Sequence, residues 1–241
     1  MIPKKIHYCW FGRGEKPALV KKCMASWKKY LPEYELKEWN EDNFDLDLFP
    51  FTREAYESRK YAFVTDVVRL YALYNEGGVY MDTDVEVLKP LDSFLHHIAF
   101  SGFEDDTQVP TGIMASEKNS IWAKENLDYY HERHFILPDG TWDTTSNVAI
   151  ITNYMVSKGL LKVNGYYDFP NLITIYPKDY FCPKSYLDKK IYLTDNTVTI
   201  HHFSGSWQYK SKVRKFADLL IGEAFAEKLR LLYCKILKFL N

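Results

Sequence analysis

The chain has 241 residues, enough for one large domain, and 46% of them are hydrophobic, so a substantial core can form without disulfides. Its formal net charge of −1 excludes the whole chain as a polyanion binder, and we expect no nucleic-acid partner. The N-terminus has no secretory h-region, and no stretch reaches the roughly 18 uninterrupted apolar residues that suggest a membrane span.

Strand-like and helix-like segments alternate through the first half of the chain. The apolar patterns predict strands at 5–11, 34–39 and 79–81, and helices at 17–30 and 61–76. Gly77 follows the second helix and is a natural left-handed cap. The alternation predicts an α/β domain with a mixed, mostly parallel sheet. In such sheets ligands bind at the carboxyl ends of strands, where Trp10, Asn40 and the acidic pair Asp82 and Asp84 would lie.

The second half of the chain continues this pattern. We expect further strands at 98–103, 112–115, 172–176 and 197–202, and further helices at 120–130 and 146–158. Apolar periodicity over 210–241 predicts two amphipathic helices that Gly222 separates. There is no internal repeat and no linker-like segment. We therefore expect one domain, with a core at 1–209 and the helices of 210–241 as part of it.

Residues 210–241, the basic tail, concentrate positive charge. They carry eight Lys or Arg against three acidic residues, a net charge of +5, which leaves −6 for the rest of the chain. This asymmetry is typical of a segment that contacts an anionic surface, such as the inner face of a cell membrane. A solvated helix face explains it equally well, and the sequence alone leaves both interpretations open.

The four cysteines, Cys9, Cys23, Cys182 and Cys234, form no Cys-x-x-Cys pair and lie among apolar or aromatic residues. This placement is typical of reduced thiols in a protein core. We therefore expect a cytoplasmic protein without structural disulfides.

Two carboxylates one residue apart, Asp82 and Asp84, follow Gly77-Gly78 and a short apolar run. Residues i and i+2 of an extended segment point the same way, so both carboxylates can face one small volume. Such oxygen ligands suit Mg²⁺ or Mn²⁺, and Mg²⁺ is usually shared with substrate phosphates. The pair predicts a metal ion that holds a diphosphate, although paired acids are also common in ordinary surface loops.

Asp66 and Arg69 lie at positions i and i+3 of the predicted helix 61–76, among apolar neighbours. Taken alone, this spacing favours a local ion pair that contributes little to stability. In the functional interpretation, Asp66 accepts hydrogen bonds from sugar hydroxyls while Arg69 donates to them.

His201 and His202 end a predicted strand, before a Gly/Ser turn that presents Trp207. Neutral imidazole is a ready ligand for a first-row metal. Side chains alternate along a strand, so only one of the two rings can face a given side. Packing is the stronger interpretation of an isolated His pair. Trp10, between a strand and a glycine turn, could equally stack on a nucleobase or pack in the core.

Taken together, these segments resemble glycosyltransferase family 32, whose members include polymannan-initiating and capsular-polysaccharide transferases. The sugar-transferring domains of large clostridial toxins are distantly similar. The resemblance spans nearly the whole chain, and it is carried by residues 2–12, 39–43, 61–70, 77–85, 176–185 and 201–207. It is densest at 77–85, around the acidic pair.

The resemblance implies a GT-A fold, a nucleotide-sugar donor and a metal-dependent retaining transfer. The donor would be a UDP-hexose, UDP-galactose or UDP-glucose. The acceptor would be a saccharide or a lipid-linked saccharide in capsular, exopolysaccharide or other surface glycan synthesis. The enzyme would be cytoplasmic, and it would lie at the inner face of the membrane if the basic tail binds lipid.

The resemblance also implies roles for individual residues. The catalytic residues would be Asp66, Arg69, Asp82 and Asp84. The donor-binding residues would be Trp10, Asn40, Thr65, Asp66, Arg69, Tyr80, Asp82, Ser206 and Trp207. The metal, Mn²⁺ or Mg²⁺, would be bound by Asp82, Asp84 and His202, with His201 as the alternative to His202.

Within that set, Trp10 would stack on the base, and Asp66 and Arg69 would hold hydroxyls of the ribose and the donor sugar. Tyr80 would line the same pocket. Ser206 and Trp207 would close over the diphosphate.

Two other functions fit parts of the pattern. A phosphatase or phosphotransferase can use an Asp-x-Asp nucleophile, but such sites expect Thr or Val two residues after the second Asp, where this chain has Glu86. A non-catalytic nucleotide-sugar or carbohydrate-binding protein could keep the same fold. Binding of a nucleotide-sugar without turnover would favour that alternative.

Overall fold

The structure is a computed structural model, and it describes residues 1–109, 112–185 and 188–204. Met1–Ser204 form one compact unit. The predictions for Ser206, Trp207, Cys234 and the basic tail fall outside the described residues. No helix in the described part of the chain is both long enough and apolar enough to cross a bilayer.

Helices and strands alternate through the first half of the chain, as the apolar pattern predicts. The strands there are β1 (Lys5–Cys9), β2 (Glu35–Trp39), β3 (Gly78–Met81) and β4 (Val85–Val87). The helices are α1 (Ala18–Tyr30), α2 (Pro50–Glu57) and α3 (Tyr61–Glu76), with a short 3₁₀ helix, η1, at Leu46–Leu48.

The second half contributes the other side of the domain. Its strands are β5 (Ala99–Gly102), β6 (Ile113–Ser116), β7 (Tyr167–Phe169), β8 (Ile173–Tyr176) and β9 (Thr199–His201). Its helices are α4 (Ile121–Asp128), α5 (Asn147–Ser157) and α6 (Lys178–Phe181), with the 3₁₀ helix η2 at Asp92–Phe94. Ser120 and Ser146 cap α4 and α5, because each hydroxyl accepts a hydrogen bond from a backbone N–H of the first turn.

Among the described residues, seven strands form one sheet in the order β2-β1-β3-β6-β5-β8-β7. The pairs β1–β2, β1–β3 and β5–β8 are parallel, whereas β6 and β7 run antiparallel to their neighbours. β4 and β9 form a separate antiparallel pair. The predicted α/β class with a mixed, mostly parallel sheet is confirmed.

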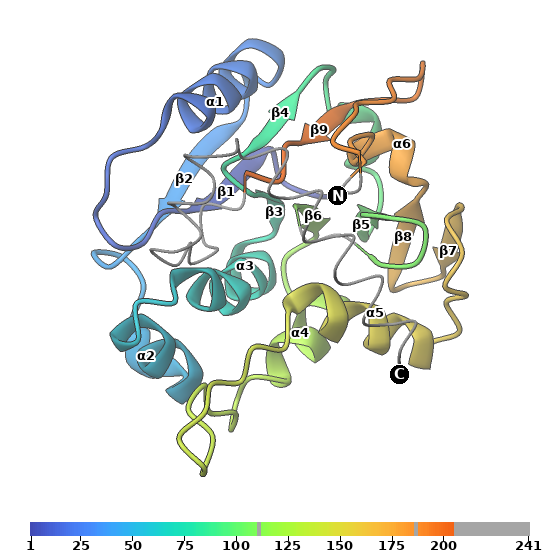
Figure 1. Cartoon of the computed structure of the whole chain (residues 1–241). Coiled ribbons are helices and arrows are strands. Elements are labelled where there is room, and N and C mark those ends of the chain that lie inside the picture. Colours follow the sequence, from blue (N-terminus) through green and yellow to red (C-terminus); the bar gives the residue numbers. More distant parts are fainter. Residues whose placement is uncertain (110–111, 186–187, 205–241) are drawn as a thin grey trace. The chain divides into compact units, whose positions relative to one another are not determined.

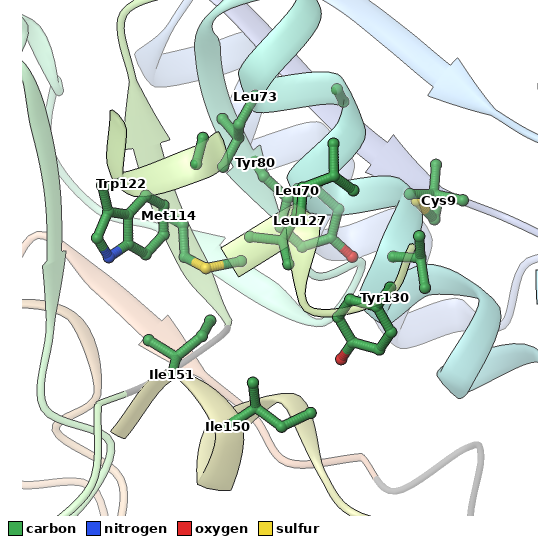
Figure 2. Packing of buried hydrophobic residues seen from close by; sticks show 14 of the residues in the cluster. Cys9, Leu70, Leu73, Tyr80, Met114, Trp122, Leu127, Tyr130, Ile150 and Ile151 are labelled. Carbon is green, nitrogen blue, oxygen red and sulfur yellow. The ribbon is translucent and has the colours of Figure 1, made fainter. Parts of the chain in front are cut away.

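Alternation along the strands creates a core on each face of the sheet. On β3, Tyr80 packs into one core cluster and its neighbours Val79 and Met81 pack into the other. β6 repeats this division, with Met114 on the Tyr80 side. The Tyr80 side is covered by α3, α4 and α5 (Figure 1). Figure 2 shows side chains from these helices converging on Tyr80 and Met114.

α1 belongs to the opposite face. Its Trp27 is fully buried among the apolar side chains of that second cluster, and its indole Nε1 donates a 2.7 Å hydrogen bond to the Val85 carbonyl of β4. Val20 and Cys23 precede Trp27 at helical spacing and are buried on the same side of α1. Cys9, Cys23 and Cys182 are all buried and free, as expected for reduced thiols.

Two glycines bring the end of α3 directly into β3. Gly77 and Gly78 have φ values of 69° and 115°, a region that favours glycine. A Cβ on Gly78 would lie 2.7 Å from the Lys5 carbonyl oxygen, so the close pairing of β1 and β3 also requires a glycine there. His7 fixes this junction: its Nε2 donates to the Gly77 carbonyl at 2.8 Å, and its Nδ1 accepts from Trp39 at 3.0 Å.

The apolar pattern misses several short elements. It predicts no element for α2, although Pro50 at its first turn and buried Phe51 and Ala55 on one side are helix signals. β4, β7 and α6 have three or four residues each, too few for a period to show. Their positions depend on tertiary pairing, such as the β4–β9 ladder, and that pairing leaves no local pattern.

Candidate active site

Asp82 and Asp84 lie in a tight turn between β3 and β4 rather than on the extended segment that the sequence suggests. The Val85 amide donates to the Asp82 carbonyl at 3.0 Å, and the Asp82 amide donates to the Gly112 carbonyl at 2.8 Å. The turn forms because the chain leaves the central sheet after Met81 and pairs with β9 from Val85 onwards. That pairing sets Val85 opposite His201 and carries the acidic pair to the end of β9.

Asp82, Asp84 and His201 form a compact group of potential metal ligands, the Asp-Asp-His group. His201 Nε2 lies 3.3 Å from Asp84 Oδ1 and 3.9 Å from Asp82 Oδ2. One ligand atom from each residue fits within a mutual distance of 4.8 Å. Two carboxylate oxygens and one imidazole nitrogen suit Mn²⁺, and the carboxylates alone also suit Mg²⁺. The side chains present therefore fit a divalent cation.

Of the two candidate histidines, the structure places His201, the alternative to His202, beside the two carboxylates. Adjacent residues at the end of a strand present their side chains to opposite sides. His202 Nε2 lies 2.8 Å from Glu86 Oε2, and Glu86 also pairs with Lys22. His202 therefore contacts Glu86 rather than the acidic pair. Its backbone amide still supports the site by donating to the Asp84 carbonyl at 3.1 Å.

The charges of the Asp-Asp-His group compensate one another. Burial alone would raise the pKa of Asp84, but hydrogen bonds from His201 and the Ser204 amide hold it well below its usual range. Burial alone would lower the pKa of His201, but Asp84 and the Cys182 thiol hold it well above its usual value. Asp84 is therefore a carboxylate at neutral pH. A divalent cation would have to displace the proton that His201 carries.

Arg69 links α3 to the acidic turn. Its side chain is 5% exposed, and its Nη2 lies 3.2 Å from Asp82 Oδ1 and 3.3 Å from Asp66 Oδ1. Its Nε donates to the Thr65 carbonyl, and Thr65 Oγ1 accepts from Nη2, both at 3.1 Å. The guanidinium carbon lies 4.7 Å from the centre of the Tyr80 ring. Asp66 and Arg69 thus form a local ion pair, and Arg69 also contacts Asp82, one of the candidate metal ligands.

Tyr80 is buried, so it positions this network and presents little surface to a pocket. Its hydroxyl donates to Asp82 Oδ1 at 2.9 Å. Asp66, on the other side of Arg69, has its pKa raised to about 7 by burial, which outweighs the attraction of Arg69. The backbone of Asn147, at the start of α5, hydrogen-bonds to Asp66. These contacts hold the Asp66 carboxyl between α3 and α5.

Trp10 and Asn40 follow the carboxyl ends of β1 and β2, as predicted. The Trp10 ring is partly exposed, donates to the Gly14 carbonyl at 2.6 Å and has the Lys16 ammonium 5.3 Å from its centre. The Asn40 amide is used within its own turn, where it bonds to Glu38 and to the amide of Asp42. In the described part of the chain, neither side chain bonds to the Asp-Asp-His group.

Sequence reasoning overlooked two neighbours of His201 and one of His202. Glu104 follows β5, and its Oε1 lies 3.9 Å from His201 Nδ1. Gly112 precedes β6, and a Cβ there would lie 2.7 Å from the same nitrogen, so the ring needs a glycine at this point. Lys184 donates to the His202 carbonyl. Glu104 directly follows a predicted strand, and this position could have identified it as a candidate site residue.

Residues 17–101 match the protein family described as glycosyltransferase sugar-binding region containing DXD motif. Asp82-Thr83-Asp84 lies within the matched residues. Inositol phosphoceramide mannosyltransferase 3 of Schizosaccharomyces pombe is 31% identical to this chain over 121 residues. The alignment covers 48% of this chain and 34% of that relative, so the chain spans about a third of the length of the relative.

Two solved glycosyltransferase structures are similar at low sequence identity. The PaToxG glycosyltransferase has a TM-score of 0.49 and 19% identity, over 66% of this chain and 70% of that one. A glycosyltransferase involved in glycosylation of the major capsid of PBCV-1 has a TM-score of 0.47 and 12% identity, over 83% of this chain and 94% of that one.

Proposed function

We propose, on the premise that residues 17–101 carry the sugar-binding region of the DXD glycosyltransferases, that this protein transfers a hexose from a nucleotide-sugar to a saccharide acceptor. The proposed donor is a UDP-hexose, either UDP-galactose or UDP-glucose. The proposed acceptor is a saccharide or lipid-linked saccharide of a surface glycan. The net charge of +5 in residues 210–241 supports a further proposal, that the basic tail contacts the membrane where such acceptors grow.

The observation that carries this proposal is the Asp-Asp-His group at the edge of the sheet. Its two carboxylates and one imidazole come from a turn and a strand more than a hundred residues apart, and the fold brings their ligand atoms within 4.8 Å. Mn²⁺ or Mg²⁺ would be held by Asp82, Asp84 and His201. When bound, the cation supplies Lewis-acid stabilisation of the charge that develops on the leaving diphosphate.

Arg69 and Asp66 supply the polar contacts for the donor. Arg69 is a buried cation, and its contacts with Asp66 and Asp82 fix the guanidinium and both acidic side chains in place. Asp66, with a pKa of about 7, can accept hydrogen bonds from sugar hydroxyls when ionised. Because this charged network is already in place, it needs little rearrangement during the reaction. Such preorganisation is the main advantage of charged active sites.

The transfer is proposed to retain the anomeric configuration. The sugar becomes oxocarbenium-like as the bond to the diphosphate breaks. The acceptor hydroxyl attacks from the face that the diphosphate leaves, and the departing phosphate oxygen takes its proton. The protein orients the donor and excludes water, and no side chain forms a covalent bond to the sugar.

Nucleotide release from a panel of nucleotide-sugars, with and without Mn²⁺, tests this function. We expect Mn²⁺-dependent release of UDP from one UDP-hexose, followed by NMR detection of a product with the donor's anomeric configuration. An inverted product would contradict the retaining mechanism. UDP and Mn²⁺ could also stabilise the protein against heat while no donor releases nucleotide, even with saccharide acceptors supplied. That result would contradict the proposed transferase activity and indicate a binding protein.

A further inference from the structure

Three neighbours of the His201 ring fix its place, but one ring nitrogen has no hydrogen-bond partner among the described residues. Its Nε2 faces Asp84 and Asp82, the candidate metal ligands. The Phe203 ring lies 4.2 Å from it between ring centres, and Gly112 leaves just enough space on another side. Nδ1 is buried and lacks a hydrogen-bond partner among the described residues. Leaving a buried N–H without a partner costs free energy, so we expect a hydrogen-bond acceptor near this nitrogen.

Glu104 is the acidic residue that faces Nδ1. Its Oε1 is 3.9 Å from that nitrogen, about an ångström beyond hydrogen-bond distance. The backbone around Glu104 is fixed, because the Phe103 amide donates to Tyr176 at 2.9 Å and the Glu104 amide donates to Gln108 at 2.8 Å. The Glu104 side chain, rather than its backbone, is therefore the part that would move to close the gap.

Cys182 is the rival partner, since its thiol also contacts His201. A thiol is a weak acceptor, whereas a carboxylate is a strong one. The chemistry therefore favours Glu104 over Cys182 as the group that orients the imidazole.

We propose that Glu104 is a positioning residue that accepts the Nδ1–H hydrogen bond of His201 and thereby aims Nε2 at the metal. This inference rests on the proposed function, because it assumes a divalent cation between His201, Asp82 and Asp84. When Nε2 binds a cation, the single proton of the neutral ring is on Nδ1, the atom that faces Glu104. Metal-binding histidines usually donate this second N–H to a carboxylate, carbonyl or water, which fixes the tautomer and the ring orientation.

Mn²⁺ affinity in the presence of saturating UDP, measured from the EPR signal of free Mn²⁺, tests the proposal without relying on turnover. Glu104→Ala is expected to raise the Kd for Mn²⁺ by about 10- to 100-fold, the usual effect of losing such a partner. Glu104→Gln keeps an acceptor oxygen, so its Kd is expected to stay within about threefold of the native value. Cys182→Ser is the matched control on the same ring and should change the Kd little.

Each other result overturns the proposal in a distinct way. An unchanged Kd in Glu104→Ala would show that Glu104 does not orient the ring. Equal loss in Glu104→Gln and Glu104→Ala, at native thermal stability, would make Glu104 a direct ligand. Native Mn²⁺ affinity with abolished kcat in Glu104→Gln would give it a chemical role. If the native chain with UDP binds no Mn²⁺ at all, the proposed function itself fails.

Discussion

Asp84→Asn is expected to lower Mn²⁺-dependent nucleotide release by at least about a hundredfold, comparable to removing one preorganised charge-stabilising group. Asp84 is ionised at neutral pH, because His201 and the Ser204 amide hold its pKa well below the usual range despite burial. Asparagine therefore removes a full charge and one candidate oxygen ligand, with almost no change in volume. The amide oxygen can still accept from the Ser204 amide, so the turn should keep its shape.

The measurement is the rate of UDP release as a function of Mn²⁺ concentration, with thermal unfolding recorded for each variant. Asp92→Asn is the control, since Asp92 is an exposed carboxylate whose partner is the surface residue Lys4. This control should release nucleotide at the native rate. Native release by Asp84→Asn, with the same Mn²⁺ half-saturation, would contradict the assignment of Asp84 as a ligand.

Arg69→Met is expected to destabilise the fold by about 3–5 kcal/mol, the range for breaking a buried ion pair by removing one partner. Methionine fills a similar volume but leaves the carboxylates of Asp66 and Asp82 without their shared cation. It also leaves the Thr65 carbonyl without the donor at Nε. The free energy of unfolding from urea titration measures the loss.

The effect of Arg69→Met should depend on pH through Asp66. The folded-state pKa of Asp66, about 7, lies above its unfolded value of 3.8, so the folded state binds more protons between these values. Its contribution to stability is therefore present at low pH and is lost as the pH rises through 7. Without Arg69 the carboxyl is harder to ionise, and the variant should lose more stability at pH 8 than at pH 5.

Arg53→Met is the matched control for Arg69→Met. Arg53 pairs with Asp47 on the surface of α2, and its side chain is 37% exposed. Surface pairs contribute about 0–1 kcal/mol, so this control should unfold nearly as the native chain does. Equal losses from Arg53→Met and Arg69→Met would contradict the view that the Arg69 network is a buried, coupled unit.

The sequence predicted the parts of the fold that have a local period. α3 has the predicted bounds, because Val64, Val67 and Val68 recur at helical spacing and Gly77 ends the helix. The α/β class with a mixed sheet is confirmed, and residues 17–101 match a family of DXD glycosyltransferases, in agreement with the resemblance. Helix period, capping glycine and motif are each contained in one segment of the chain, so a single sequence displays them.

The site depended on relations that no local pattern contains. Alternation along a strand allows only one of the two histidines to face a given side, and the β4–β9 register is what sets His201 opposite Val85, beside the acidic turn. That register joins residues more than a hundred positions apart. The same pairing turns the chain between Asp82 and Asp84, where the sequence suggested an extended segment. Glu104 Oε1 lies 3.9 Å from His201 Nδ1, although the two residues are far apart in the chain and no spacing in the sequence reveals the contact.

The affinity for Mn²⁺ in the presence of UDP, compared between His201→Ala and His202→Ala, tests the claim that the Asp-Asp-His group is the metal centre of a nucleotide-sugar site. His201→Ala should weaken Mn²⁺ binding by at least about tenfold, since it removes a proposed direct ligand. His202→Ala should bind Mn²⁺ as the native chain does, because it loses only the contact with Glu86. The opposite order, or equal and native affinities in both variants, would contradict the account.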